Sequence, residues 1–147
     1  MDEAGFEEGD FANVFATEEQ CAKILADRRV RACKFTGSCR GGENVAIACA
    51  KYVKKGCFEL GGSDPFLVLK DANMEQAVNA AYASRMGNSG QTCVSAKRFI
   101  ITAPVYDEFK ERLLEKIKTA TVVGDPMDPA TTLGPLAAPI QKERMLD

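Results

Sequence analysis

The amino-acid sequence predicts an α/β fold with a largely parallel β-sheet. Short apolar segments that are typical of strands alternate along the chain with amphipathic helical segments, which is the order found in α/β proteins. The composition is that of a globular protein, with 46% hydrophobic and 27% charged residues. A chain of 147 residues is also long enough to bury a core without disulfide or metal staples. Together these observations exclude a disordered, collagen-like or coiled-coil fold for the whole chain.

The first half of the chain contains two predicted helices and two predicted strands. In order they are a helix over 17–26, a strand over 29–35, a helix over 42–54 and a strand over 57–60. Thr17 is predicted to cap the first helix, because acidic residues follow it in the first turn. The first strand is expected to turn Val30 and Ala32 inward, with residues 33–35 as further candidates. The second helix carries an apolar stripe that includes Cys49 and Val53.

The second half repeats the alternation. Its predicted elements are a strand over 66–69, a helix after 71, a polar loop over 87–93, a strand over 97–102, a helix after 104, a loop over 122–135 and a terminal helix. The continuous apolar run at 66–69 indicates a strand buried on both faces. Asp71 is a candidate helix cap, and Pro104 is expected at the first position of its helix. Because the alternation restarts after the glycines at 61 and 62, we expect a boundary there, with domains at 1–60 and 61–147.

The distribution of charge argues against nucleic-acid and membrane partners. The net charge is −2, although residues 21–60 hold nine bases and three acids. Aromatic residues do not alternate with these bases in a stacking pattern, so we interpret the basic stretch as a solvated face or as loops near an anionic ligand rather than as a nucleic-acid surface. The apolar runs are too short to cross a bilayer. The acidic amino terminus resembles neither a secretory signal nor a transit peptide, so we expect a cytoplasmic protein.

The cysteines and the missing histidine limit the available chemistry. An even count of six cysteines permits three disulfides, but the sequence has no signal peptide and no C-x-x-C pair, which favours a reducing compartment. The absence of histidine excludes Cys–His and Ser–His–Asp catalysis and the usual zinc sites, so we expect no metal site. A nucleophile in this chain must be activated by a carboxylate, by backbone N–H groups or by a cofactor.

Three segments are candidates for chemistry, and each also has a purely structural interpretation. The stretch 35–42 is a strand, a turn of small residues and a helix start, which suits either a phosphate site or an ordinary βα turn. Glu59 is either a partly buried general base or an edge-strand residue that faces water. Cys93 is either a nucleophile near backbone N–H groups or a small buried hydrophobic residue. Arg85 either contacts an anionic substrate or is an exposed arginine at a helix end.

Taken together, these segments resemble the aldehyde dehydrogenase superfamily along nearly the whole chain. The stretches 61–66 and 96–99 are most similar to the succinate-semialdehyde dehydrogenase branch. The spacing between the glutamate and cysteine motifs is also that of the family. The matching motifs are Phe35-Thr36-Gly37-Ser38 with Gly42, Glu59-Leu60-Gly61-Gly62 with Pro65, Asn88 with Gly90-Gln91 and Cys93, Arg98, Tyr106-Asp107 with Phe109, Gly124-Asp125-Pro126, and Gly134-Pro135-Leu136.

The resemblance implies a fold and a reaction. It implies a partial aldehyde dehydrogenase-like α/β fold, in which residues 1–60 end a Rossmann-type cofactor domain and residues 61–147 begin the catalytic domain. The expected reaction oxidises a small-molecule aldehyde, with succinate semialdehyde as the candidate, to a carboxylic acid. The expected cofactor is NAD or NADP. Cys93 would form a thiohemiacetal and then a thioester, Glu59 would activate water as the general base, and the main-chain N–H of Cys93 would help to stabilise the oxyanion.

The resemblance also assigns cofactor contacts. Gly37 and Ser38 would lie against the pyrophosphate, Gly42 belongs to the same motif, and the backbone of Leu60 would lie near the nicotinamide. We expect these residues, with the helix N-terminus that follows Ser38, to form the cofactor side of the site.

The sequence lacks other parts of a complete family member. We do not find the strands that begin the nucleotide-binding domain, the residues around the adenosine ribose, the asparagine of the oxyanion hole, or the oligomerisation strands through which the parent family forms homo-oligomers. We therefore expect little or no activity from the chain alone. The alternative function is that of an inactive, truncated paralogue or fragment that acts only as an interaction protein. The parent enzyme is expected in the cytoplasm or in mitochondria.

Overall fold

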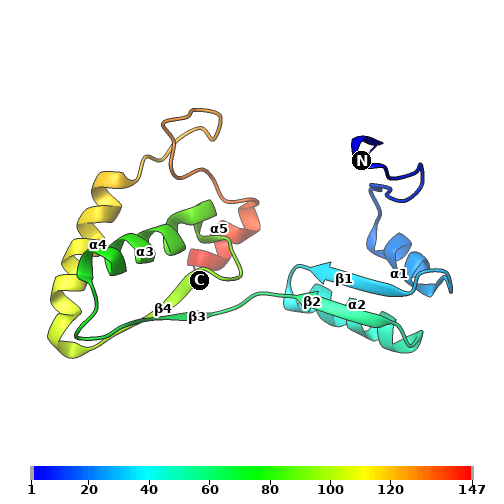
Figure 1. Cartoon of the computed structure of the whole chain (residues 1–147), viewed down its shortest axis with the longest axis horizontal. Coiled ribbons are helices and arrows are strands. Elements are labelled where there is room, and N and C mark those ends of the chain that lie inside the picture. Colours follow the sequence, from blue (N-terminus) through cyan, green and yellow to red (C-terminus); the bar gives the residue numbers. More distant parts are fainter. Residues whose placement is uncertain (1, 147) are drawn as a thin grey trace. The chain divides into compact units, whose positions relative to one another are not determined.

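The structure is a computed structural model that describes residues 2–146, and it divides the chain into two compact units (Figure 1). Unit 1 extends to Leu60 and unit 2 begins at Gly61. Each unit contains helices and one two-stranded sheet, and both sheets are parallel. The prediction of an α/β chain with parallel strand pairing is therefore confirmed.

Unit 1 is built on the β1–β2 pair, against which helix α2 packs. Its elements are η1 (Asp2–Ala4), α1 (Glu18–Ala26), β1 (Ala32–Thr36), α2 (Cys39–Lys51) and β2 (Lys55–Glu59). The strands pair in parallel from Ala32 opposite Lys55 to Thr36 opposite Glu59. The buried apolar side chains of this unit are Leu25 from α1 and Cys49 from α2.

The first helix begins where the sequence predicts. The hydroxyl of Thr17 accepts a hydrogen bond from the Gln20 amide at 3.2 Å, and the Gln20 side chain accepts one from the Thr17 amide at 2.8 Å. This reciprocal capping box satisfies two amide groups that the first helical turn leaves without partners.

The first strand begins at Ala32 rather than at Arg29. The Asp27 carboxylate accepts hydrogen bonds from the amide and the guanidinium of Arg29, and the Val30 amide donates to the Asp27 carbonyl at 3.1 Å. These bonds make a turn of the segment that alternation alone assigned to the strand. Within β1, Cys33 is half-buried and Ala32 is exposed, so the prediction that Ala32 faces the interior is wrong.

The second helix begins and ends earlier than predicted. It starts at Cys39, because the hydroxyl of Ser38 accepts a hydrogen bond from the Gly41 amide at 3.2 Å and so caps the helix. It ends at Lys51, and Val53 then adopts a left-handed conformation with φ 52° and is 94% exposed. The prediction that Val53 lies on the buried stripe is therefore wrong.

Unit 2 is built on the β3–β4 pair. Its elements are β3 (Asp64–Val68), α3 (Met74–Met86), η2 (Gly87–Gly90), β4 (Ala96–Ile101), η3 (Ala103–Val105), α4 (Tyr106–Ala120) and α5 (Pro139–Leu146). The strands pair in parallel from Pro65 opposite Arg98 to Val68 opposite Ile101, with an irregularity at Asp64.

The core of unit 2 lies between the sheet and helices α3 and α4, which Figure 1 shows on the same side of β3 and β4. Its buried members are Val68, Val78, Ala81 and Phe109. The helices cover only one face of the sheet. Leu67 points to the other face and is therefore 62% exposed. The prediction that residues 66–69 are buried on both faces is wrong for this reason.

Two predicted helix starts in unit 2 also differ in detail. The cap of α3 is Asn73, whose side-chain oxygen accepts a hydrogen bond from the Gln76 amide at 3.0 Å, so the assignment of this role to Asp71 is wrong. Pro104 is the second residue of the short η3 turn, and α4 begins after that turn at Tyr106, so the prediction that Pro104 is the first residue of its helix is wrong. Among residues 2–146, none of the helices combines the length and the apolarity that a bilayer span requires.

Candidate active site

The predicted cofactor-binding residues meet at the carboxyl end of the β1–β2 pair. Thr36 and Glu59 are opposite each other in the last register position, and the Gly37 amide donates to the Glu59 carbonyl at 3.0 Å. Ser38 follows directly and caps α2. The carboxyl edge of parallel strands is where open α/β sheets bind their ligands.

The glycines of this turn allow close packing. A Cβ atom at residue 42 would lie 2.5 Å from Cδ2 of Leu60, and one at residue 37 would lie 2.7 Å from the ring of Phe35. The structure thus places Leu60 directly on Gly42. Packing alone accounts for glycine at these two positions, as the interpretation of an ordinary βα turn requires.

The other interpretation of this turn, a phosphate site, draws on the free amide groups at the start of α2. The first turn of α2 presents amide groups that the helix itself leaves without acceptors, and Ser38 takes one of them, that of Gly41. Such a helix N-terminus suits a negatively charged phosphate. Gly37, Ser38, Gly42, Leu60 and Glu59 are all close to the carboxyl edge of the β1–β2 pair in unit 1.

Glu59 is the last residue of β2, and its side chain is exposed in unit 1. The sequence analysis offered two interpretations of Glu59, a partly buried residue or one that faces water. Within unit 1 its side chain faces solvent. Its main chain is held by pairing with β1 and by the bond from Gly37, so a rigid strand end carries the carboxylate.

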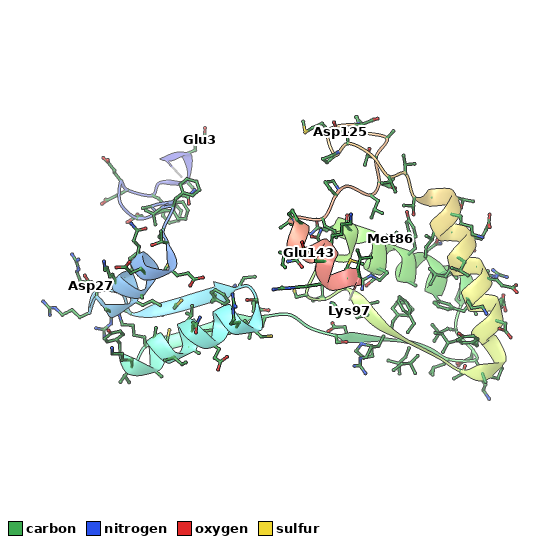
Figure 2. The ribbon with its side chains drawn as sticks, turned by 180° about the vertical axis from the view of Figure 1, so that it is seen from behind. Glu3, Asp27, Met86, Lys97, Asp125 and Glu143 are labelled. Atoms are coloured by element: carbon green, nitrogen blue, oxygen red, sulfur yellow. The ribbon has the colours of Figure 1, made fainter. Side chains whose placement is uncertain are left out.

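Cys93 belongs to unit 2, where it follows η2 in the loop between α3 and β4. Its side chain is exposed, which contradicts the interpretation of Cys93 as a small buried hydrophobic residue. The thiol-bearing residue lines a cavity of about 920 Å³, whose wall also includes Gln91, Lys97, Leu136 and Met145. Figure 2 labels Met86, the last residue of α3, and Lys97, in β4, which precede and follow this loop along the chain.

Exposure alone does not distinguish Cys93, because Cys21, Cys39 and Cys57 are exposed as well. Burial raises the pKa of the Cys33 thiol, with its neighbour Cys49 as a further cause, which disfavours the reactive thiolate there. What sets Cys93 apart is its position in a braced loop at the wall of the cavity.

The loop is braced by motif residues that are distant in sequence. The side-chain amide of Asn88 donates to the main-chain carbonyl of Gln91 at 3.2 Å, and the side-chain amide of Gln91 donates to the main-chain carbonyl of Asn88 at 3.0 Å. The side-chain oxygen of Gln91 accepts a bond from the Ala137 amide at 2.8 Å, and the Ser89 hydroxyl donates to the Gly134 carbonyl at 2.8 Å. Two motifs of the sequence analysis are thus in direct contact in the folded unit.

Two cations also hold the loop, and sequence reasoning assigned neither of them this role. Arg85 donates to the carbonyls of Gly90 at 2.8 Å and Ala96 at 3.0 Å and is half-buried, so the interpretation of Arg85 as an exposed arginine at a helix end is wrong. Lys97 donates to three carbonyls of the same loop. The one available signal was the proximity of both residues in sequence to Cys93.

Comparisons with known proteins agree with these motifs. The sequence model of the aldehyde dehydrogenase family matches residues 1–147. The chain is 44% identical over 133 residues to the NADP+ succinate-semialdehyde dehydrogenase of Mycobacterium avium. The matched residues make up 90% of this chain and 28% of that protein.

Solved structures show the same partial coverage. The succinic semialdehyde dehydrogenase of Streptococcus pyogenes in complex with NADP+ matches with a TM-score of 0.91 and 46% identity, over 99% of this chain and 32% of that one. An NAD-dependent aldehyde dehydrogenase from Sinorhizobium meliloti matches with a TM-score of 0.90 and 30% identity, over 97% of this chain and 28% of that one. The chain therefore spans less than a third of these relatives, and its α/β fold is that of the corresponding part of an aldehyde dehydrogenase. Because the family model matches from the first residue to the last, the chain belongs to the aldehyde dehydrogenase family.

Proposed function

We propose that this protein oxidises a small aldehyde to a carboxylic acid, with Cys93 as the nucleophile and Glu59 as the general base. The observation that carries the proposal is the exposed Cys93 on a loop braced by family motif residues at the wall of a cavity. NADP+ or NAD+ supplies the hydride acceptor when it is bound. In this assignment residues 1–60 belong to the cofactor domain and residues 61–147 to the catalytic domain.

The reaction assigns one step to each of the two residues. The Cys93 thiolate attacks the aldehyde carbon and forms a thiohemiacetal, whose hydrogen then leaves as hydride, so that a thioester remains on Cys93. Glu59 takes a proton from a water molecule that attacks the thioester carbonyl. The carbon–sulfur bond breaks, the carboxylic acid leaves, and the Cys93 thiol is free again.

The cofactor contacts are proposed at the carboxyl edge of the β1–β2 pair. The N-terminus of α2, after Gly37 and Ser38, is suited to the pyrophosphate. Leu60, which packs on Gly42, is proposed to lie near the nicotinamide through its backbone. Succinate semialdehyde is the proposed substrate, because two of the three relatives named above, those from Mycobacterium avium and Streptococcus pyogenes, are named as dehydrogenases of this aldehyde.

A covalent trap tests the proposal without requiring rapid turnover. The chain is incubated with succinate semialdehyde and either NADP+ or NAD+, quenched in acid, and examined by intact-mass and peptide mass spectrometry. We expect Glu59→Gln to accumulate a succinyl thioester on Cys93, because the adduct forms but is not hydrolysed. Cys93→Ser should carry no adduct, and Glu43→Gln, which changes an exposed glutamate of α2, should behave like the unmodified chain.

The location of the adduct decides the outcome. An adduct on a different cysteine would remove Cys93 from the mechanism. No adduct with either cofactor, in the unmodified chain and in Glu59→Gln, would contradict the proposal and favour the non-catalytic alternative.

A further inference from the structure

We propose that Lys97 is a positioning residue, which aligns and polarises the peptide group that carries the main-chain N–H of Cys93. Its ammonium group donates to the carbonyls of Thr92 at 3.0 Å, Cys93 at 2.9 Å and Ser95 at 3.0 Å. An ammonium group has three donors, and here all three are directed at one loop. The proposal rests on the function proposed above, which assigns the nucleophile to Cys93.

The bond to Thr92 acts on the amide of Cys93. The Thr92 carbonyl and the Cys93 N–H belong to the same peptide group, which is planar and trans. Holding the oxygen at Lys97 therefore directs the N–H away from Lys97. A cation on the carbonyl oxygen also withdraws electrons from the peptide group and makes its N–H a stronger donor, as in cooperative hydrogen-bond chains.

This N–H is the donor that the proposed reaction uses. A donor fixed in advance at the developing oxyanion lowers the barrier, because it needs no reorientation in the transition state. Lys97 does not have to touch the substrate to contribute, since its effect passes through the Thr92–Cys93 peptide group.

The second and third bonds hold the rest of the loop. The Cys93 carbonyl belongs to the following peptide group, so both peptide groups around the Cys93 Cα are tied to one ammonium. The main-chain angles of Cys93 are then restricted, and the direction of its thiol depends on a single side-chain rotation. The bond to Ser95, a residue that is 2% exposed, connects this arrangement to the buried start of β4.

Arg85 has a different role, which makes Lys97 separable from it. Arg85 joins Gly90 to Ala96, at the two ends of the loop, and its guanidinium occupies the space that a side chain at Gly90 would need. Loss of Arg85 loosens the loop as a whole. Loss of Lys97 acts on the two peptide groups of the nucleophile.

The test combines a spectroscopic measurement with a kinetic one on the full chain. Cysteine is labelled with 15N, and the Cys93 amide signal is identified by its absence in Cys93→Ser. In Lys97→Met, which keeps the length of the side chain but has no donor, we expect the Cys93 amide 15N signal to move upfield. The signals of Cys33 and Cys49 should remain in place. Lys70→Met, which removes an exposed lysine of the same unit, is the matched control.

The kinetic measurement is the rate of acylation in the covalent trap. Removal of an oxyanion donor itself costs about 100-fold or more, and Lys97 acts through such a donor, so we expect a loss of about 10-fold in Lys97→Met. Lys97→Arg keeps the charge and donors, and it should restore both the Cys93 signal and most of the rate. If Lys97→Met does not fold, Lys97→Gln takes its place, since it lacks the charge.

The two measurements separate the two proposals. An unmoved Cys93 amide signal in the variant without the charge, or equal losses in Lys97→Arg and Lys97→Met, overturns the role of Lys97. If the signal moves but the unmodified chain never forms an acyl adduct, the positioning by Lys97 stands and the proposed function fails.

Discussion

Leu60 lies so close to Gly42 that a Cβ atom at residue 42 would come within 2.5 Å of the Leu60 Cδ2 atom. This contact joins the first turns of α2 to the residue that follows β2, and it connects two of the proposed cofactor contacts. It also explains why the helix accepts a glycine where an alanine would be the better helix former.

The contact predicts a specific double-mutant result. Gly42→Ala should lower the free energy of unfolding by about 1 kcal/mol, because overpacking outweighs the gain in helix propensity. In a Leu60→Ala background the same change should instead raise stability by up to about 1 kcal/mol, since the steric conflict is gone. Urea unfolding of the four proteins measures the coupling, and additive effects would show that the contact is unimportant.

The left-handed backbone conformation of Val53 leads us to expect that glycine at this position would stabilise the fold. After α2, the Val53 amide donates to the Ala50 carbonyl at 3.1 Å and the Lys54 amide to the Cys49 carbonyl at 2.9 Å, which is the Schellman pattern. Its left-handed position usually holds glycine, yet a β-branched valine with φ 52° occupies it and is 94% exposed. Val53→Gly should therefore raise the free energy of unfolding by about 1 kcal/mol.

The control for this change is Val14→Gly, at an exposed valine outside the left-handed region. Thermal unfolding should show a gain for Val53→Gly and none for Val14→Gly. Equal shifts in both variants would mean that the backbone at Val53 is not strained.

The hydroxyl groups of Ser95 and Ser84 differ in their hydrogen bonds, so we expect substitution by alanine to change the free energy of unfolding differently at the two positions. In the described part of the chain the Ser95 hydroxyl is buried and has no hydrogen-bond partner, so Ser95→Ala should leave stability unchanged or raise it by about 1 kcal/mol. The Ser84 hydroxyl accepts a bond from the buried Ala96 amide at 2.9 Å, and Ser84→Ala should cost about 1–3 kcal/mol. Denaturant unfolding compares the two, and a larger loss for Ser95→Ala would contradict the assignment.

Asp27 predicts a pH dependence of stability. Hydrogen bonds from the guanidinium and then the amide of Arg29 hold the pKa of the Asp27 carboxyl well below its usual range. A carboxyl with a lower pKa in the folded state adds stability above its unfolded pKa of about 4 and loses it as the pH falls through the folded value. The stability difference between the unmodified chain and Asp27→Asn should therefore be present at neutral pH and shrink below pH of about 4.

Arg29→Met should reduce the same pH-dependent difference, because it removes the main cause of the lowered pKa. The measurement is the free energy of unfolding as a function of pH. If the stability difference between the unmodified chain and Asp27→Asn stayed constant into the acid range, the Asp27 carboxyl would have the same pKa in the folded and unfolded states.

Sequence reasoning was most successful where a local rule decides the structure. The start of α1 after its cap Thr17 follows from hydrogen bonds within the first turn of that helix. It failed where two local signals compete. Asp71 and Asn73 are both good caps, and in the structure it is Asn73 whose side chain accepts the hydrogen bond from the Gln76 amide.

The candidate site shows the same division. The motifs indicated Glu59 and Cys93 as candidates for the catalytic groups, because these residue types and their spacing resemble those of one family. The bracing of the Cys93 loop was not visible, because an arginine or lysine in a sequence does not reveal which carbonyls its side chain will reach. Arg85 and Lys97 acquire their roles when the loop turns back between α3 and β4.

By itself, the sequence of this protein determined the alternation of helices and strands, the family and the two residues proposed to be catalytic, since each depends on residue types and their order along the chain. The tertiary structure alone decided that one face of β3 stays open, that Leu60 lies on Gly42, and that Lys97 holds both peptide groups of Cys93. The reason is that burial, steric contact and convergent hydrogen bonds depend on distances between residues that are set only when the elements pack together.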